Sequence, residues 1–202
     1  MNRRHSGILL HPTSLPSPFG IGDLGSSAYD FIDFTVEAGQ TLWQVMPLGP
    51  TGYGDSPYAS LSAFAGNPTL ISPSKLVEDG YLDPEALADF PTFDSPTKID
   101  FCNVELAKMQ LFRESFAYFM LSSSRSEKRR FFNFCESRTT RPWLHNYCLF
   151  MALKTVFEKS WVEWDEGLVL RDPHVIQHYE KELSEEITFH KYLQYLFFKQ
   201  WQ

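Results

Sequence analysis

The sequence has few of the features that mark membrane proteins, disulfide-rich proteins or nucleic-acid-binding proteins. No apolar run approaches the roughly 20 residues that span a bilayer, and the N-terminal run GILL is too short for a signal peptide. The three cysteines are odd in number and widely spaced, so we expect reduced core thiols in a cytoplasmic protein. With 18 Lys and Arg against 25 Asp and Glu, the net charge of −7 argues against nucleic acid and anionic membranes as partners.

Several catalytic signatures are missing as well. The G-x-S-x-G turn of serine hydrolases, the C-x-x-C pair and the H-E-x-x-H metal motif do not occur. His174 and His178 have the i, i+4 spacing of a metal chelate on a predicted helix. No Glu lies between them in the required position and no third ligand is obvious, so we interpret them as a surface helix face rather than a metal site.

The segment GIGDLG at residues 20–25 matches the G-x-G-x-x-G pattern and lies between a predicted strand and a predicted helix. A nucleotide-binding α/β domain is therefore one hypothesis. About nine Pro-rich residues separate the strand from these glycines, and MPLG stands where the acidic ribose ligand would follow the second strand. We therefore favour turn and helix-entry glycines over a dinucleotide site.

The composition is that of a globular protein, with 43% hydrophobic residues and 16% aromatic residues. The apolar runs GILLH (7–11) and TLWQVM (41–46) predict two buried strands. Between them, Ser26 or Ser27 is suited to cap a helix that Gly39 ends. Strand, helix and strand in this order predict an α/β fold with a parallel sheet.

Beyond residue 70 the pattern is helical. Short helices are predicted at SPSKL and DPEAL, and longer ones at about 102–121, 126–137, 144–156 and 176–201. The one further strand candidate is NPTLI (67–71). Two parallel strands do not make a stable sheet alone, and the chain ends within an apolar periodicity. We therefore expect the amino-terminal part of a larger protein.

The segment WVEWDE (161–166) combines two Trp with three acidic residues. Exposed Trp rings stack on sugars, and paired carboxylates serve as general acid and base in glycosidases. Adjacent acids on a loop are usually only solvated, however, and Trp side chains usually pack on a neighbouring helix. The structural interpretation is therefore preferred here.

The most informative segment is PLGPTGYGDSPYAS (47–60), directly after the second predicted strand. Its Gly and Pro residues restrict the backbone, and Asp55 is suited to an Asx turn. Tyr53 and Tyr58 would then stand on a rigid frame at the carboxyl end of a parallel strand, with the Ser56 hydroxyl beside them. Flat apolar rings with hydroxyls suit a sugar, whereas the alternative is a structural loop whose tyrosines pack on the domain.

Four segments together identify a resemblance. They are GILLHPTSLPSPFGIGDLG, LWQVMPLGPTGYGDSPYASLSAFAGNP, WLHNYCLFMALK and EEITFHKYLQYLFFKQWQ. They closely resemble the 4-α-glucanotransferases called amylomaltase or disproportionating enzyme, glycoside hydrolase family 77, and the likeness extends along the whole chain. The resemblance implies a partial (β/α)8 TIM barrel with an inserted, mainly helical subdomain. Residues 1–70 would hold the first two barrel strands, 71–185 the insertion and 186–202 the start of the next barrel helix.

The resemblance also implies an activity. Family members transfer a segment of an α-1,4-glucan to the 4-hydroxyl of another glucan or to water, by a retaining double displacement that needs no cofactor. Tyr58 matches the tyrosine that stacks on the donor sugar, and Tyr53 and Ser56 match positions that line the glucan cleft. The family's catalytic carboxylates lie in motifs without a counterpart in residues 1–202, so this chain alone is expected to be inactive. The alternative is a non-catalytic carbohydrate-binding or interaction module.

Overall fold

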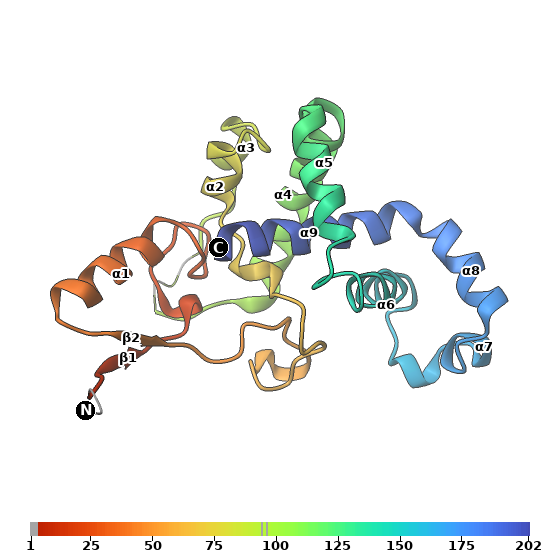
Figure 1. The fold of residues 1–202 in the computed structure, drawn as a ribbon, viewed down its shortest axis with the longest axis horizontal. Helices are drawn as coiled ribbons and strands as arrows, with labels where there is room; N and C mark the ends of the chain where they lie inside the picture. Colours follow the sequence, from red (N-terminus) through yellow and green to blue (C-terminus); the bar gives the residue numbers. More distant parts are fainter. Residues whose placement is uncertain (1–3, 94, 96) are drawn as a thin grey trace. The chain divides into compact units, whose positions relative to one another are not determined.

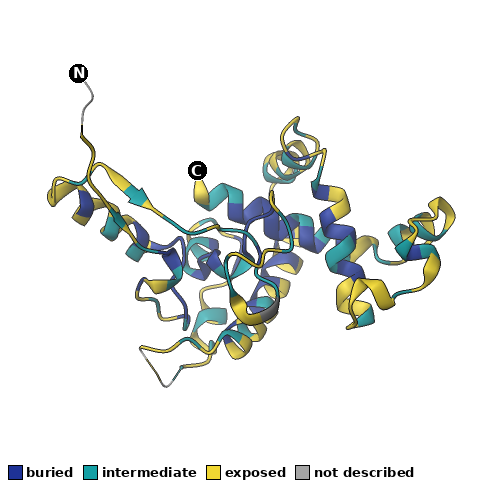
Figure 2. Ribbon diagram, turned by 90° about the horizontal axis from the view of Figure 1, so that it is seen from below, coloured by how far each residue is buried: buried dark blue, intermediate teal, exposed yellow. Residues whose placement is uncertain are grey.

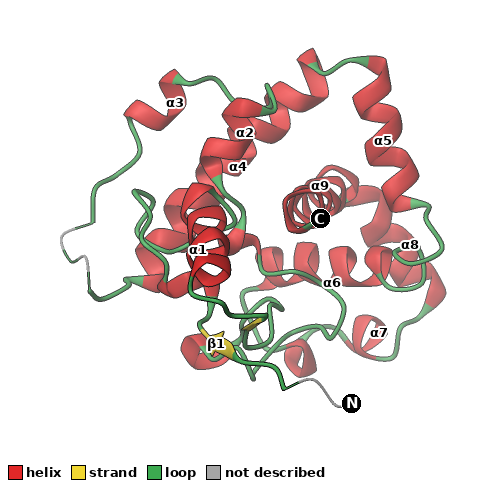
Figure 3. Cartoon of the chain, turned by 60° about the vertical axis from the view of Figure 1, so that its left-hand side comes forward, coloured by secondary structure: helices red, strands yellow, loops and turns green. Residues whose placement is uncertain are grey.

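The structure of the chain is a computed structural model that describes residues 4–93, 95 and 97–202 (Figure 1). Helices dominate, and one short pair of strands lies near the N-terminus (Figure 3). The elements in chain order are β1 (Gly7–Leu9), η1 (Pro12–Ser14), α1 (Ser26–Glu37), β2 (Leu42–Gln44), η2 (Tyr53–Asp55), η3 (Pro68–Leu70), α2 (Pro73–Glu78), α3 (Glu85–Ala88), α4 (Phe101–Ser122), α5 (Arg125–Cys135), α6 (Leu144–Phe157), η4 (Trp161–Glu163), α7 (Glu166–Val169), α8 (Pro173–Glu182) and α9 (Ser184–Trp201).

The chain divides into two compact units. The first comprises Met1–Ser123 and Leu196–Gln202, and the second comprises Ser124–Tyr195. Helix α9 therefore begins in the second unit and ends in the first. Among the described residues, no helix is both long enough and apolar enough to cross a membrane.

The two strands pair in parallel, which confirms the predicted strand–helix–strand order. Ile8 lies beside Trp43, and the Phe31 ring of α1 contacts the Trp43 ring at 4.9 Å, so α1 covers that face. On the opposite face Leu9 and Leu42 are 59% and 56% exposed (Figure 2). The expectation that both strands are buried was therefore wrong, because the described residues cover only one face of the pair.

Helix α1 begins and ends by different means. Gly25, rather than Ser26 or Ser27, occupies the N-cap position, and its N–H donates to the Asp23 carboxylate at 2.9 Å. The predicted serine cap is therefore wrong, because Ser26 already lies inside the helix and no side chain caps it. At the other end Gly39 adopts a φ of +69°, the left-handed conformation that ends helices, as the sequence predicted.

The segment 67–72 forms the centre of the first unit. It was predicted as a strand, but Pro68–Leu70 is a 3-10 turn whose N-cap, Asn67, accepts the Thr69 N–H at 3.0 Å. The proline fixes φ at the first position of this turn, which favours a helical start over a strand. The carbonyl oxygens of residues 69–72 accept hydrogen bonds from α4, from the loop before α1 and from α9. We call this segment the carbonyl row.

Three donor groups bond to the four oxygens of the carbonyl row. The Lys108 ammonium of α4 donates to Thr69 O at 2.7 Å and to Ile71 O at 3.0 Å. The Leu24 N–H donates to Leu70 O at 2.9 Å, and the Gln200 amide of α9 donates to Ser72 O at 3.1 Å. Buried carbonyls require such partners, so the row ties three elements together.

The remaining helices agree with the sequence pattern at most places, although α7 (Glu166–Val169) was not predicted. Helices α2 and α3 occur at SPSKL and DPEAL, and α4, α5 and α6 occur where the longer helices were predicted. The last predicted helix is divided, because α8 ends at Glu182 and α9 begins at Ser184. In the second unit, α5 opens with a capping box in which Ser124 Oγ and the Glu127 side chain bond reciprocally to the backbone.

The three thiols differ in exposure. Cys102 is exposed in the first turn of α4, so the expectation that all three cysteines lie in the core was wrong for this residue. Cys135 is half-buried and Cys148 is buried. Burial raises the pKa of the Cys135 thiol to about 11 and raises the pKa of the Cys148 thiol further.

The capping box of α5 generates the first testable prediction. Replacing Ser124 with Ala removes the acceptor of the Glu127 N–H, which lies 3.2 Å away. We predict a loss of about 1 kcal/mol in the free energy of unfolding, measured by urea denaturation followed by circular dichroism. Ser126→Ala, in the exposed first turn of the same helix, is the matched control and should change stability little. Equal stability of the two variants would contradict the capping role.

Candidate functional site

The candidate site begins where the two parallel strands end. His11 follows β1 and Pro47 follows β2, and the imidazole joins these two segments. Nδ1 of His11 accepts the Thr13 N–H at 3.3 Å, so the ring proton resides on Nε2, which donates to Pro47 O at 3.4 Å. The His11 ring is buried, and burial lowers its pKa below 6.5 although the Pro47 carbonyl opposes that shift. The neutral ring thus fixes the start of the loop that leaves β2.

Residues 50–61, which we call the tyrosine hairpin, form the most prominent feature of this loop. Thr51 and Ser60 make an isolated antiparallel bridge. The Gly52 N–H donates to Ala59 O at 2.8 Å, and the Leu61 N–H donates to Pro50 O at 3.0 Å. Below the hairpin, the Asn67 N–H donates to Leu48 O at 2.8 Å. Backbone hydrogen bonds therefore join the two arms of the loop at several positions along its length, which gives the loop a fixed shape.

Glycines permit this shape for two different reasons. Gly54 has a φ of +75°, which disfavours any residue with a Cβ. Gly52 has an ordinary negative φ, but a Cβ there would lie 2.9 Å from Ala59 O. Asp55 also adopts a positive φ of 54°, which Asp tolerates better than most residues. Among the described hydrogen bonds, the side chain that bonds to the backbone here belongs to Ser56 and not, as predicted, to Asp55. The Ser56 hydroxyl accepts the Tyr58 N–H at 3.3 Å.

The structure places two of the three predicted substrate-contacting residues on the outer part of the hairpin. The Tyr58 side chain is 76% exposed, so its ring faces the surroundings and not the interior. The Ser56 side chain is partly exposed directly before it. Tyr53 begins the turn Tyr53–Asp55, but its side chain lies outside the described part of the structure. An exposed ring beside a hydroxyl, held on a fixed backbone, is suited to stacking on a sugar.

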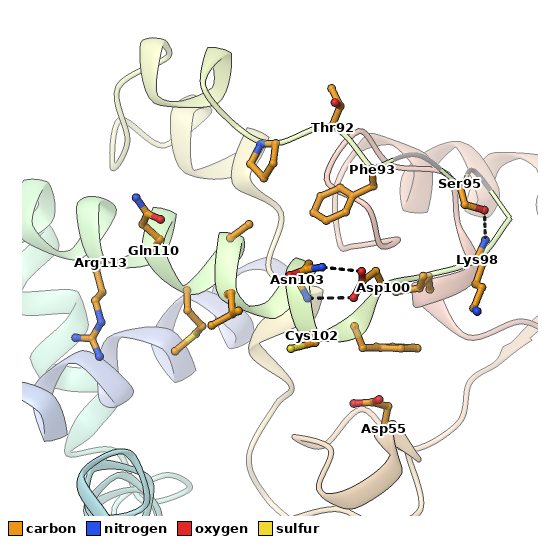
Figure 4. A pocket seen from close by; sticks show the side chains of 16 residues that line it. Asp55, Thr92, Phe93, Ser95, Lys98, Asp100, Cys102, Asn103, Gln110 and Arg113 are labelled. Carbon is orange, nitrogen blue, oxygen red and sulfur yellow. Dashed lines mark hydrogen bonds between the residues drawn. The ribbon is translucent and has the colours of Figure 1, made fainter. Parts of the chain in front are cut away.

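Asp55 faces an open cavity of about 1260 Å³ (Figure 4). Its other walls come from residues 91–93, 95 and 98–100 and from the first half of α4. The lining alternates apolar side chains with polar and charged ones, and Asp100 caps α4 by accepting the Asn103 N–H at 3.2 Å. Sequence reasoning assigned Asp55 to loop geometry alone, whereas the structure also makes it part of this cavity.

A second, smaller cavity lies at the base of the hairpin. It encloses about 340 Å³ and is lined by residues 47–49, by residues 60–66 and by the end of α9. Phe197 and Trp201 of α9 contribute aromatic rings. Gly66 is required at this place, because a Cβ there would lie 2.0 Å from the Phe197 ring. The segment that follows the hairpin is thus set closely against the end of α9.

The structure supports the preferred interpretation of GIGDLG. A Cβ on Gly22 would lie 2.1 Å from Pro12 O, and a Cβ on Gly25 would lie 2.6 Å from Ser72 Oγ. Gly20 has a φ of +75° and faces the Phe93 ring. The chain's own atoms therefore occupy the space in front of these glycines, where a phosphate would have to bind.

The other candidates belong to the second unit. Trp164 packs between Phe150 and Phe157, at 5.6 Å and 5.8 Å, which agrees with the structural interpretation of WVEWDE, while Trp161 is half-exposed. His178 is exposed and lies 3.5 Å from Glu182. Among the residues that the structure describes, no three His, Cys, Asp or Glu side chains gather as a metal ion would require.

Sequence reasoning missed two buried polar residues near the hairpin, His11 and Lys108. Lys108 has a detectable signal, because it falls on the same helix face as Val104 and Phe112, at i, i+4 spacing in both directions. A lysine on an apolar face must find buried partners. His11 has only its position after an apolar run, which does not reveal that it bonds to Pro47.

Comparisons with known proteins agree on one family. The family model described as 4-alpha-glucanotransferase matches residues 10–202. A 4-alpha-glucanotransferase of Synechocystis is 43% identical to this chain over all of its length, and that of Thermus thermophilus is 45% identical over 98% of it. The alignments cover 40% and 38% of those two proteins, so the chain spans about two fifths of the length of these relatives.

The solved structures give the same result. An amylomaltase from Streptococcus agalactiae, determined in complex with acarbose, matches 98% of this chain with a TM-score of 0.91 and 34% identity, over 40% of its own chain. The amylomaltase of Corynebacterium glutamicum matches 97% of this chain and 27% of its own, with a TM-score of 0.70. That second match, at 19% identity, supports the fold alone.

The buried imidazole of His11 generates a pH prediction. Because its pKa is lowered on folding, the folded chain binds fewer protons than the unfolded chain below about pH 6.5. The contribution of the neutral His11 ring to the free energy of unfolding is therefore present at neutral pH and is lost on acidification. In His11→Gln we expect a smaller drop in the free energy of unfolding between pH 7.5 and 5.5, measured by urea denaturation. Identical slopes in His11→Gln and in the unmodified chain would contradict the assignment.

Proposed function

This chain belongs to the 4-alpha-glucanotransferase family, glycoside hydrolase family 77, and from that premise we propose that the complete protein transfers glucan segments. It would cleave an α-1,4-glucan and pass the released segment to the 4-hydroxyl of another glucan or of glucose. The observation that supports this most directly is the exposed Tyr58 ring on a closed hairpin at the carboxyl end of β2. In parallel sheets that end is where ligands bind.

We propose that the chain supplies one wall of the donor-sugar site. The Tyr58 ring would stack on the apolar C–H face of a glucose unit, while Ser56 and Tyr53 would line the cleft beside it. Asp55, on the same hairpin, would face a neighbouring part of the glucan through the larger cavity. The groups in this wall bind and orient the sugar, and they do not themselves break a glycosidic bond.

The bond-breaking step would use carboxylates outside residues 1–202. In a retaining double displacement, one carboxylate attacks C1 of the donor sugar while a carboxylic acid protonates the departing glycosidic oxygen. The acceptor 4-hydroxyl then attacks C1 and gives its proton to the residue that first acted as the acid, now a carboxylate, while the bond between C1 and the nucleophilic carboxylate breaks. This chemistry is complete without a cofactor, and a wall that keeps water away from the covalent intermediate favours transfer over hydrolysis.

The finer architecture follows from the same family membership. We propose that β1 and β2 are the first two strands of a (β/α)8 barrel, with residues 1–70 as the start of the barrel. Residues 71–185 would be an inserted helical subdomain, and 186–202 would begin the next barrel helix. The exposed side chains of Leu9 and Leu42 support this proposal, because a barrel strand needs cover on both faces. We also propose a cytoplasmic location for a protein of this composition.

Tyr58 provides the most direct test of the donor site. In the complete protein, Tyr58→Ala should lower kcat/KM for maltotriose disproportionation at least roughly fivefold, because an aromatic contact of this kind is worth about 1 kcal/mol or more. Tyr58→Phe keeps the ring and should retain most of the activity. Tyr118→Ala, at an exposed tyrosine of α4, is the control. An unchanged rate in Tyr58→Ala would remove Tyr58 from the site.

A second experiment separates the proposed enzyme from a binding module. The 202-residue chain alone, incubated with maltotriose, should release no glucose and form no longer oligomers, because the proposed catalytic carboxylates lie outside it. Product analysis by chromatography is the measurement, and the complete protein is the positive control. Turnover by the chain alone would mean that the carboxylates are misplaced. Glucan binding by a complete protein that lacks transfer would favour the non-catalytic module.

A further inference from the structure

Lys108 is the most deeply buried charged side chain of the first unit among the described residues, with 1% of it exposed. It extends from the middle of α4 to the carbonyl row, where its ammonium donates to Thr69 O and Ile71 O. Asp23 Oδ2 lies 3.6 Å from the same nitrogen. Burial lowers the pKa of Lys108 to about 8, and the Asp23 charge opposes that shift. Burying a lysine side chain costs free energy, which implies that its N–H groups have a structural role.

The two carbonyl contacts of Lys108 are linked to the tyrosine hairpin by further hydrogen bonds. They hold the chain on both sides of Leu70, one within the 3-10 turn that Asn67 caps and one directly after it. The Asn67 side chain accepts from both the N–H and the hydroxyl of Thr69, so the turn and its cap move together. The Asn67 N–H in turn donates to Leu48 O, which lies just before the hairpin. A continuous series of hydrogen bonds therefore joins Lys108 to the base of the hairpin.

Asp23 plays a separate part in the same cluster. Its Oδ1 accepts the Gly25 N–H at 2.9 Å, and its Oδ2 accepts the Ser17 hydroxyl at 3.2 Å. Those bonds fix the entrance to α1, on the other side of the ammonium. Removing the Asp23 charge would leave the two carbonyl contacts of Lys108 in place, since even an uncharged amine has two N–H donors. The two residues can therefore be tested independently.

We propose that Lys108 is a positioning residue for the tyrosine hairpin: by holding the carbonyls of Thr69 and Ile71 it fixes the hairpin that carries Tyr58. The inference rests on the proposed function of Tyr58 as a donor-sugar contact. The hairpin is anchored at its start by His11 on Pro47 O and at its end by Lys108 through Asn67. A ring fixed at both ends of its loop keeps its place without losing further conformational freedom when sugar binds.

The test compares two variants of the complete protein that share a neutral residue 23. Asp23→Asn keeps the carbonyl contacts of Lys108 and is the matched control. Asp23→Asn combined with Lys108→Met removes those contacts, fills a similar volume and leaves no lone buried carboxylate. Any difference between the two variants therefore reports the Lys108 nitrogen on the carbonyl row. Both are studied well below their unfolding temperatures.

The first readout is hydrogen exchange, which does not depend on enzyme activity. In the double variant, the bonded amides of Gly52, Leu61 and Asn67 should exchange about tenfold faster than in Asp23→Asn, since two buried hydrogen bonds are lost. Amides of α8, in the other unit, should be unchanged. An equal acceleration in α2 and α4 would overturn the proposal, because Lys108 would then stabilise the unit as a whole. Failure of the double variant to fold under conditions where Asp23→Asn folds would overturn it for the same reason.

The second readout is kinetic. We expect kcat/KM for maltotriose to fall about tenfold in the double variant relative to Asp23→Asn, the size of effect that a small misplacement of a positioning group produces. The ratio of hydrolysis to transfer should rise, because a loosened wall admits water to the covalent intermediate. That ratio is independent of how much of the protein is folded, so a purely structural role would not change it. Equal ratios and rates in the two variants would overturn the proposal.

If the unmodified protein shows no glucan transfer, the proposed function fails, and the exchange experiment alone decides whether Lys108 holds the hairpin.

Discussion

The first unit depends on one constraint: the four consecutive carbonyls of residues 69–72, most of them in buried residues, require hydrogen-bond donors. Residues 69–72 are not part of a sheet, so no neighbouring strand supplies those donors. A lysine from α4, a backbone amide before α1 and a glutamine from α9 supply them instead. Because each donor comes from a different element, satisfying the backbone of one short segment also fixes the helices around it. The buried lysine is tolerated because its charge lies near Asp23 and two carbonyl oxygens.

This constraint explains how a small sheet can carry a well-defined loop. Two strands of three residues each are too short to position a loop alone. The loop is held at its start by the neutral imidazole of His11 and at its end by the hydrogen bond between Asn67 and Leu48. Glycines then serve close packing as well as turning, as at Gly52 and Gly66. The exposed ring of Tyr58 thus stands on a frame built mostly from backbone contacts.

Local sequence signals predicted much of this fold and part of the site. Apolar periodicity predicted most of the helices, and the clustering of Pro and Gly residues predicted the loop that carries Tyr58. The errors occurred where a distant residue decides the outcome. NPTLI has the composition of a strand, but its proline and asparagine favour a capped 3-10 turn. Ser26 and Ser27 do not cap α1, because the helix begins at Ser26, directly after Gly25, whose N–H is held by Asp23. Contacts between residues far apart in sequence, such as Lys108 with Thr69, leave little trace in local patterns.

The unequal environments of the three thiols have a practical consequence. The thiolate is the reactive species, and burial keeps Cys135 and Cys148 protonated at neutral pH. Cys102 is exposed and lies on the wall of the same cavity that Asp55 faces. Within residues 1–202, a maleimide fluorophore would therefore attach mainly at Cys102 without any engineered cysteine. Its emission would report directly on whatever enters the space between the hairpin and α4.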